Sequence, residues 1–277
     1  MSNDGKVRLD SRCVPILFVC GLHRSGTTAL ANVLGSAPGV RALSKTGAPA
    51  DEGQHLQRSF NAANAHGGPG LFAFDPATHL TEHSPLATSS IARAVLDTWT
   101  PHWHLNANTM LSWGAEDGTA VLLEKSPPNL VRTRFLQALF PQARFVVLRR
   151  HPAVVAVSTS KMCPDRSVEK TLRHWLIAHS RYEADAPRIR RVHEMRYEDL
   201  LVDPAGTLHK LAEALQIDSR FDLSLLDIHR TEPHLRVWQE TAEHIPSTRL
   251  RQLDAAFQRY GYRLDEPFVL PTTAVYA

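Results

Sequence analysis

Residues 16–30 constrain the fold most, because an apolar run passes directly into a loop that contains two glycines. Residues 16–20 are continuously hydrophobic, which favours a strand buried on both faces of a parallel sheet. Gly21 and Gly26 permit backbone conformations and close approaches that a Cβ would obstruct. The pattern of the residues after Gly26 predicts the start of a helix. A strand, a glycine loop and a helix N-terminus form an anion cradle, since free backbone N–H groups and the positive helix end point at one place.

The spacing of this loop matches the first part of the nucleotide-binding pattern G-x-x-x-x-G-K-[ST], with one departure. Thr27 stands at the lysine position, and the basic residue of the loop is Arg24. Enzymes that hydrolyse nucleoside triphosphates use that lysine on the phosphates. The loop therefore predicts a phosphate site that differs from that of a nucleotide hydrolase.

Composition limits the class of protein. The chain has 277 residues, 43% of them hydrophobic, which is enough for one α/β domain over residues 1–277. A net charge of +3 is small for a nucleic-acid-binding protein, although 31 Lys and Arg suit a protein that handles an anion. No apolar run reaches the ~18 residues of a membrane span, and the first residues lack a signal-peptide core, so we expect a cytoplasmic protein. The three cysteines have neither metal-ligand nor CxxC spacing.

Hydrophobic periodicity predicts an alternation of strands and helices. The predicted strands cover residues 14–20, 121–124, 144–149 and 192–197. The predicted helices cover about 26–36, 86–113, 130–139, 153 onward, 168–186, 204–215 and 250–260. This order indicates an α/β fold of the P-loop NTPase type, with three layers and a central parallel sheet flanked by helices. Residues 41–85 are rich in Gly and Pro and are expected to form a substrate loop, and residues 1–13 a flexible N-terminus.

Three predicted strands end in residues suited to anion chemistry. The loop 21–28 follows the first, Glu124-Lys125-Ser126-Pro-Pro follows the middle one, and residues 150–158 follow the third. Because ligands of parallel sheets bind at the carboxyl ends of the strands, we expect these three segments to line one crevice.

In this order the motifs resemble those of sulfotransferases that use 3′-phosphoadenosine 5′-phosphosulfate (PAPS), and the resemblance covers about residues 14–262. It is strongest to the bacterial small-molecule branch and to the tyrosylprotein-type enzymes, whose phosphosulfate loop reads R-S-G-T-T. The resemblance implies transfer of a sulfuryl group from PAPS to a hydroxyl or amine of a small-molecule acceptor. It also implies adenosine 3′,5′-bisphosphate as the product, and neither a metal nor a nucleic-acid partner.

The resemblance assigns the segment Arg24, Ser25, Gly26, Thr27 and Thr28 to the 5′-phosphosulfate loop. Backbone donors and the threonine hydroxyls would bind the 5′-phosphate. The planar guanidinium of Arg24 would reach the sulfate or the bridging oxygen. Many cytosolic members of the family have lysine at this position.

A second segment resembles the 3′-phosphate motif of the family. Arg150 and Ser158 have its eight-residue spacing, and His151 stands where the family usually has Asp. A charge at a strand end and a hydroxyl two turns into the next helix can converge on one phosphate. Arg149 is a competing candidate, and the register of the strand decides between the two arginines.

Further matches concern catalysis and the nucleotide. Lys125, in the family's E-K-S-P element, would supply a point charge to the transferring sulfuryl group or the leaving phosphate oxygen. Tyr197 would approach the nucleotide, whereas Glu198 and Asp199 are expected to cap the next turn. Trp238 belongs to a segment that resembles the one closing over the adenine, and it could equally be a core residue.

The general base has several candidates. In the tyrosylprotein-type enzymes a glutamate shortly after the first helix has this role, and Glu52 lies in the corresponding loop about ten residues later than a gapless alignment places it. Glu52 is therefore the first choice and His55 the second, since a hydroxyl acceptor needs a base within hydrogen-bond reach. The other histidines considered are His102, His104 and His174.

Two other functions fit parts of the pattern. A P-loop kinase or NTPase would use ATP and Mg²⁺. Position 27 is not the lysine that such an enzyme needs, and the predicted strand through residues 145–148 does not end in an Asp that could hold the metal. A non-catalytic nucleotide-binding module would be favoured if Lys125 and Glu52 lay far from the loop. Neither the acceptor nor the oligomeric state follows from the sequence.

Overall fold

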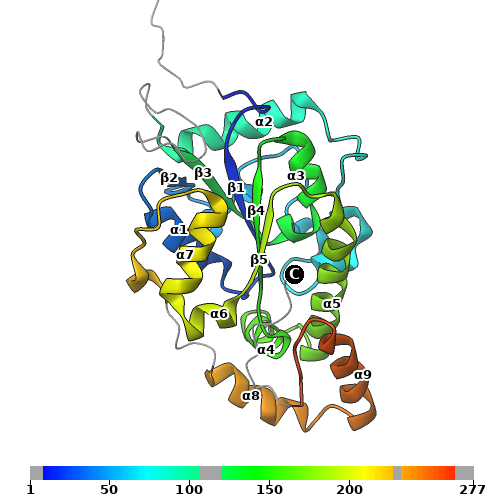
Figure 1. The fold of residues 1–277 in the computed structure, drawn as a ribbon. Helices are drawn as coiled ribbons and strands as arrows, with labels where there is room; N and C mark the ends of the chain where they lie inside the picture. The colour runs from blue at the N-terminus through cyan, green and yellow to red at the C-terminus, as the bar shows by residue number, and fades with distance from the viewer. Residues whose placement is uncertain (1–8, 106–119, 227–231, 266–277) are drawn as a thin grey trace, which may run out of the picture.

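Five parallel strands form the centre of the molecule (Figure 1). The computed structural model describes residues 9–105, 120–226 and 232–265. The strands within them are β1 (Ile16–Cys20), β2 (Val40–Ala42), β3 (Val121–Lys125), β4 (Arg144–Arg149) and β5 (Val192–Arg196). They pair in the order β2-β3-β1-β4-β5, and every pairing is parallel. All carboxyl ends therefore lie at one edge of the sheet.

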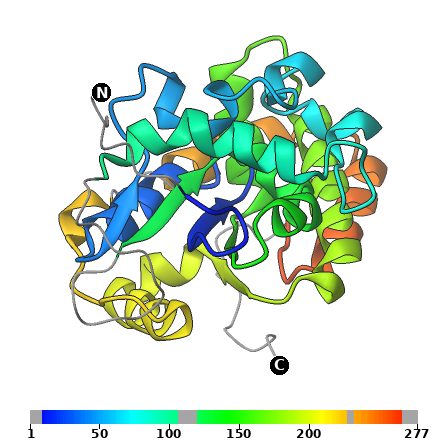
Figure 2. The same cartoon turned by 90° about the horizontal axis from the view of Figure 1, so that it is seen from above.

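Helices cover both faces of this sheet (Figures 1 and 2). The helices are α1 (Thr27–Ser36), α2 (Ser89–Trp99), α3 (Thr133–Leu139), α4 (Pro152–Met162), α5 (Val168–Asp185), α6 (Tyr197–Val202), α7 (Pro204–Leu215), α8 (Glu232–Ala242) and α9 (Ser247–Gln258). Helices α1 and α7 pack on one face, and α2, α3 and α5 on the other. The predicted α/β fold with a central parallel sheet is confirmed.

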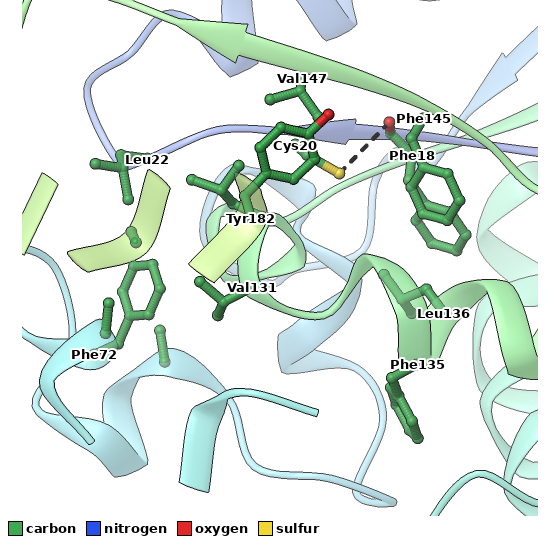
Figure 3. Close-up of a cluster of buried hydrophobic side chains, with 14 of the residues drawn as sticks. Phe18, Cys20, Leu22, Phe72, Val131, Phe135, Leu136, Phe145, Val147 and Tyr182 are labelled. Carbon is green, nitrogen blue, oxygen red and sulfur yellow. Dashed lines mark hydrogen bonds between the residues drawn. The ribbon is translucent and has the colours of Figure 1, made fainter. Parts of the chain in front are cut away.

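The alternation of side chains along β1 divides the core in two. Leu17 and Val19 face the cluster under α1 and α7, whereas Phe18 and Cys20 face the larger cluster under α2, α3 and α5. In the larger cluster the ring of Phe18 stacks on Phe145 of β4 with ring centroids 5.5 Å apart, as Figure 3 shows. Every residue of β1 is fully buried, which explains why its sequence is continuously apolar.

Most predicted elements are confirmed, and the differences have local causes. The predicted helix over 86–113 is wrong beyond Trp99, since the chain turns into a short 3₁₀ segment, Thr100–Trp103, around Pro101; residues 106–113 lie outside the described residues. The helix predicted over 130–139 begins only at Thr133, after a 3₁₀ segment that starts at Pro127. Strand β2 and helix α6 have no counterpart in the prediction because they are short. Helix α8 has none either, although it buries Leu235 and Trp238.

The N-terminal residues are partly described. Residues 1–8 lie outside the described residues, whereas Leu9 is buried and its carbonyl accepts a hydrogen bond from the Arg93 guanidinium at 2.9 Å. Within the described part of the chain, no helix has the length and apolar character needed to cross a bilayer.

The segment 41–85 is mostly irregular and contains several single-turn 3₁₀ helices. Polar contacts attach it to helices α3 and α5. His79 Nε2 lies 2.8 Å from the buried carboxylate of Asp185 in α5, which also pairs with Arg134 of α3 at 3.2 Å. Arg134 in turn pairs with Glu82. The segment is therefore packed onto helices α3 and α5.

Replacing Asp185 by alanine tests this attachment. Asp185 is 1% exposed and bonds both His79 and Arg134, so its removal takes a buried hydrogen-bond acceptor from two half-buried side chains. We expect the free energy of unfolding to fall by about 3 kcal/mol, measured by urea denaturation. Asp218→Ala removes an exposed pair with Arg220 and is the matched control, with a much smaller expected change. Equal changes in the two variants would show that the Asp185 contacts add little to stability.

Candidate active site

The loop after β1 has the geometry of an anion cradle. Ser25 N donates to Leu22 O at 3.1 Å, which closes a tight turn, and Gly26 precedes α1 with φ of 95°. The N-terminus of α1 has neither a side-chain cap nor an acidic residue in its first turn. Its N–H groups and the positive end of its dipole are thus available to an anion. A Cβ on Gly21 would lie 2.7 Å from Leu148 O, so only glycine allows the loop to leave β1 so close to β4.

A pocket of about 150 Å³ lies beside this helix end. Its lining residues come from the loop, the β4–α4 junction and helices α1, α4, α6 and α8: Arg24, Gly26, Thr27, Thr28, Ala29, Arg150, Ser158, Tyr197 and His234. The structure thus brings together nearly all the residues predicted to bind the donor; Ser25 is buried beneath them, with Oγ bonded to Leu22 O. No carboxylate is among these described lining residues, so the pocket presents positive charge and hydroxyl groups.

The polar side chains of the pocket are coupled to one another. Arg24 Nε donates to Ser158 Oγ at 2.8 Å, and Arg150 Nη1 donates to Arg24 O at 3.1 Å. The guanidinium of Arg150 lies 4.1 Å from the centroid of the Tyr197 ring, a cation–π contact. That ring also lies against Gly26, where a Cβ would be 2.4 Å from it. Tyr197 therefore packs between the loop and Arg150 and supports both.

Arg149 lies away from this pocket. Its Nη1 pairs with Glu194 Oε2 at 2.9 Å, and its guanidinium lies over the rings of Tyr182 and Tyr260. Successive side chains of a strand point to opposite faces, so only one of two adjacent arginines can reach the pocket. Of the two candidates, Arg150 has that position.

His151 and Glu198 fix the backbone next to Arg150. His151 Nδ1 accepts a hydrogen bond from Ala153 N at 3.2 Å and so caps α4, and burial lowers the pKa of His151 to about 4. Glu198 Oε1 accepts from His151 N at 2.8 Å, and Tyr262 donates to its other oxygen at 3.1 Å. Asp199 caps α6 as predicted, since its carboxylate accepts from Arg196 N, whereas the Glu198 carboxylate also holds the backbone of His151. Burial raises the pKa of Glu198.

A second group of charges lies at the end of β3. Lys125 Nζ lies 2.9 Å from Glu52 Oε1 and 3.3 Å from Ala50 O. Glu52 Oε2 accepts from Gln54 Nε2 and lies 3.6 Å from His55 Nε2. The side chains of Lys125 and Glu52 are only 5% and 9% exposed, so this is a buried ion pair with a histidine at its side. The predicted base candidates Glu52 and His55 and the predicted Lys125 thus lie together.

Glu124 positions this group, a role that the sequence analysis missed. Its carboxylate accepts from Gly53 N at 2.9 Å and from Ser126 and Asn129. Trp99 Nε1 donates to Gly53 O at 3.0 Å, which holds the same residue from the other side. Burial raises the pKa of Glu124, and these hydrogen bonds oppose the shift. Successive side chains of β3 point to opposite faces of the sheet, and this alternation is the sequence feature that could have assigned different roles to Glu124 and Lys125.

His23 is a second residue that the sequence analysis overlooked. It precedes Arg24 in the tight turn, and Arg24 has φ of 68°, so the two side chains point in different directions. The His23 ring contacts Phe72 edge-on at 5.8 Å, and its buried Nδ1 has no hydrogen-bond partner among the described residues. Burial, with the charges of Lys125, His55 and Arg24, lowers the pKa of His23 to about 3. The position of His23 within the loop 21–28 was the sequence feature that could have indicated a place at the site.

The contacts of the remaining histidine candidates are with residues of the fold. His174 is buried and packs edge-on against Phe72 at 4.6 Å, and burial lowers its pKa well below the usual range. His104 Nε2 lies 3.1 Å from Ser44 O, and the carbonyl of His102 accepts from Ser44 N. Trp238 is 1% exposed and donates to Leu264 O at 3.0 Å, which makes it a core residue.

The donor set of the pocket fits a ligand with several negative charges. Two guanidinium groups, the hydroxyls of Thr27, Thr28 and Ser158, and the open helix end converge there. Within the described residues no group of three or more His, Cys, Asp or Glu side chains could hold a metal ion.

Comparisons with known proteins concern the family and the fold. The model of the sulfotransferase family matches residues 15–222. The chain is similar in structure to the sulfotransferase domain from the curacin biosynthetic pathway, with 17% identity over 91% of this chain and 99% of that one and a TM-score of 0.54. It is also similar to the sulfotransferase domain of the Synechococcus PCC 7002 olefin synthase, with 22% identity over 81% and 80% of the two chains and a TM-score of 0.49.

Comparison with curated protein sequences gives no match. The structural likenesses concern the fold, whereas the family model covers most of the chain and all of the segments that line the pocket beside α1 except α8. The chain therefore belongs to the sulfotransferase family.

Proposed function

We propose that this protein transfers the sulfuryl group of PAPS to a hydroxyl or an amine of a small-molecule acceptor, in the cytoplasm. The observation that carries the proposal is the convergence of Arg24, Arg150 and Ser158 beside the open N-terminus of α1. When bound, PAPS supplies the sulfuryl group and adenosine 3′,5′-bisphosphate as the leaving group. The two arginines and the helix end offer separate positions for its two phosphate-bearing ends.

In this proposal the loop and α1 hold the 5′ end of the donor. Backbone N–H groups of residues 26–28 and the hydroxyls of Thr27 and Thr28 bind the 5′-phosphate. Arg150 and Ser158 bind the 3′-phosphate. Arg24, which donates to Ser158, lies between the two ends, where its guanidinium reaches the sulfate.

The acceptor side is formed by the end of β3 and the segment 41–85. Glu52 takes the proton of the acceptor hydroxyl as that oxygen attacks the sulfur, and His55 is the alternative base. Lys125 pairs with Glu52 and presents a positive charge to the sulfuryl group, whose charge is spread over three oxygens in a loose transition state. Holding base and donor in place provides the rest of the catalysis. We propose that the segment 41–85 contacts the acceptor, since it carries Glu52, His55 and Phe72.

The position of Lys125 favours this function over a purely binding module. Lys125 and Glu52 are paired, and the charge of Lys125 acts on His23, the neighbour of Arg24. The proposed base and point charge therefore lie beside the anion loop. Nothing about nucleotide binding alone requires a buried Lys–Glu pair there, and such a pair costs desolvation free energy.

Arg150→Ala tests the donor assignment. Because only adenosine 3′,5′-bisphosphate has the 3′-phosphate, we expect its affinity to fall about 10- to 100-fold, whereas that of adenosine 5′-phosphate changes little. Isothermal titration calorimetry with both nucleotides measures this difference. Arg220→Ala, at an exposed pair, is the control. Equal losses for the two nucleotides would contradict the assignment of Arg150 to the 3′-phosphate.

Lys125→Ala tests the catalytic charge. We expect the rate of bisphosphate release from PAPS, assayed with simple phenol and alcohol acceptors, to fall about 100-fold. Bisphosphate affinity should stay nearly unchanged, because Lys125 lies outside the donor pocket. Lys161→Ala, on the exposed end of α4, is the matched control. Unchanged turnover in Lys125→Ala would remove this lysine from the mechanism.

Glu52→Gln and His55→Gln together identify the base. The glutamine at position 52 keeps the size of the side chain but cannot take a proton, so we expect turnover to fall 10²- to 10⁴-fold, as is typical for a lost general base. His55→Gln should have a smaller effect if His55 only neighbours the carboxylate. The opposite order of the two effects in the same assay would assign the base to His55.

A further inference from the structure

Helix α8 brings a histidine to the donor pocket from outside the matched family region. The family model ends at residue 222, whereas α8 covers Glu232–Ala242. His234 of this helix is half-buried and lines the pocket together with Arg24, Arg150 and Ser158. None of the sequence motifs pointed to His234.

The position of α8 is set by its apolar face. Leu235 and Trp238, which are 5% and 1% exposed, lie three residues apart and face the protein interior. Trp238 Nε1 donates to Leu264 O at 3.0 Å, which ties the helix to the C-terminal described segment. The helix packs along α4, which carries Ser158 (Figure 1). His234 is thus held at the pocket by buried anchors next to it in the helix.

We propose that His234 is a donor-binding residue that hydrogen-bonds the 3′-phosphate beside Arg150 and Ser158 and takes up a proton when the nucleotide binds. The inference rests on the proposed function, since it assumes a nucleotide with a 3′-phosphate. An imidazole adds an N–H donor to a pocket whose other groups are guanidiniums and hydroxyls. Once protonated, it adds a third positive charge opposite a dianionic phosphate.

The charges around His234 set the direction of the proton coupling. Arg24 of the loop and Arg150 of the β4–α4 junction line the same pocket, together with the phenol of Tyr197 from α6. The carboxylate of Glu198, below Arg150, is already bonded to His151 N and Tyr262. Two arginines disfavour a third cation in the absence of ligand, whereas the phosphate favours it. Binding should therefore raise the proton occupancy of His234, and its contribution to affinity should grow as the pH falls from 8 to 6.

The test is calorimetric titration of adenosine 3′,5′-bisphosphate and adenosine 5′-phosphate into wild type, His234→Gln and His244→Gln at pH 6 and pH 8. His244 is exposed beyond the end of α8 and serves as the control. We expect His234→Gln to weaken the bisphosphate about tenfold at pH 6 and less at pH 8, with less than a twofold change for the monophosphate. Repeating the titrations in buffers of different ionisation enthalpy should show more proton uptake by wild type than by His234→Gln. The ligand's own phosphates titrate equally in both proteins, so this difference reports on His234.

Several outcomes would overturn the inference. An unchanged bisphosphate affinity in His234→Gln, or equal losses for the two nucleotides, would exclude a contact with the 3′-phosphate. A loss of affinity that is independent of pH, with equal proton uptake, would exclude the protonation. If Arg150→Ala abolishes the preference for the bisphosphate while His234→Gln does not, only the role of His234 fails. If wild type itself has no preference for the bisphosphate, the proposed function fails together with it.

Discussion

The parallel pairing of β1 with β3 and β4 is the constraint on which the site depends. In this register Val19 lies beside both Lys125 and Val146, so the loop after β1 starts level with the charged end of β3. One strand further, Arg149 lies beside Arg196, which places Arg150 next to Tyr197. Groups from four separate segments thus meet at one edge without any long loop having to reach across the sheet.

The tight turn at residues 22–25 divides this edge into two sides. Arg24 points to Ser158 and the pocket, whereas His23 points to Phe72 and the charge of Lys125. The left-handed conformation of Arg24 thus directs its guanidinium, proposed to reach the sulfate, away from the groups proposed to act on the acceptor. Non-glycine residues adopt this conformation at a cost, and such costs are concentrated at functional sites.

Buried polar groups, whose desolvation costs free energy, stabilise the side of the edge that holds Lys125 and Glu52. Glu124 is satisfied by Gly53 N, Ser126 and Asn129, and Glu52 by Lys125 and Gln54. Through these bonds the irregular segment 41–85 is attached to the end of β3. This network is therefore sensitive to substitution, because removing one polar group leaves its buried partner without a hydrogen bond and with little water nearby.

The sequence by itself determined the strands with continuous apolar runs, the long helices, and those pocket-lining residues that belong to local motifs, such as Arg24 and Thr27. These follow from short-range patterns, namely side-chain periodicity and the backbone freedom of glycine. Only the tertiary structure placed Arg150 at the pocket and Arg149 away from it, joined Glu52 to Lys125, and brought His23 and His234 to opposite sides of the turn at residues 22–25. Those outcomes depend on strand register and on the packing of α8 against α4, and both arise from contacts between residues far apart in the chain.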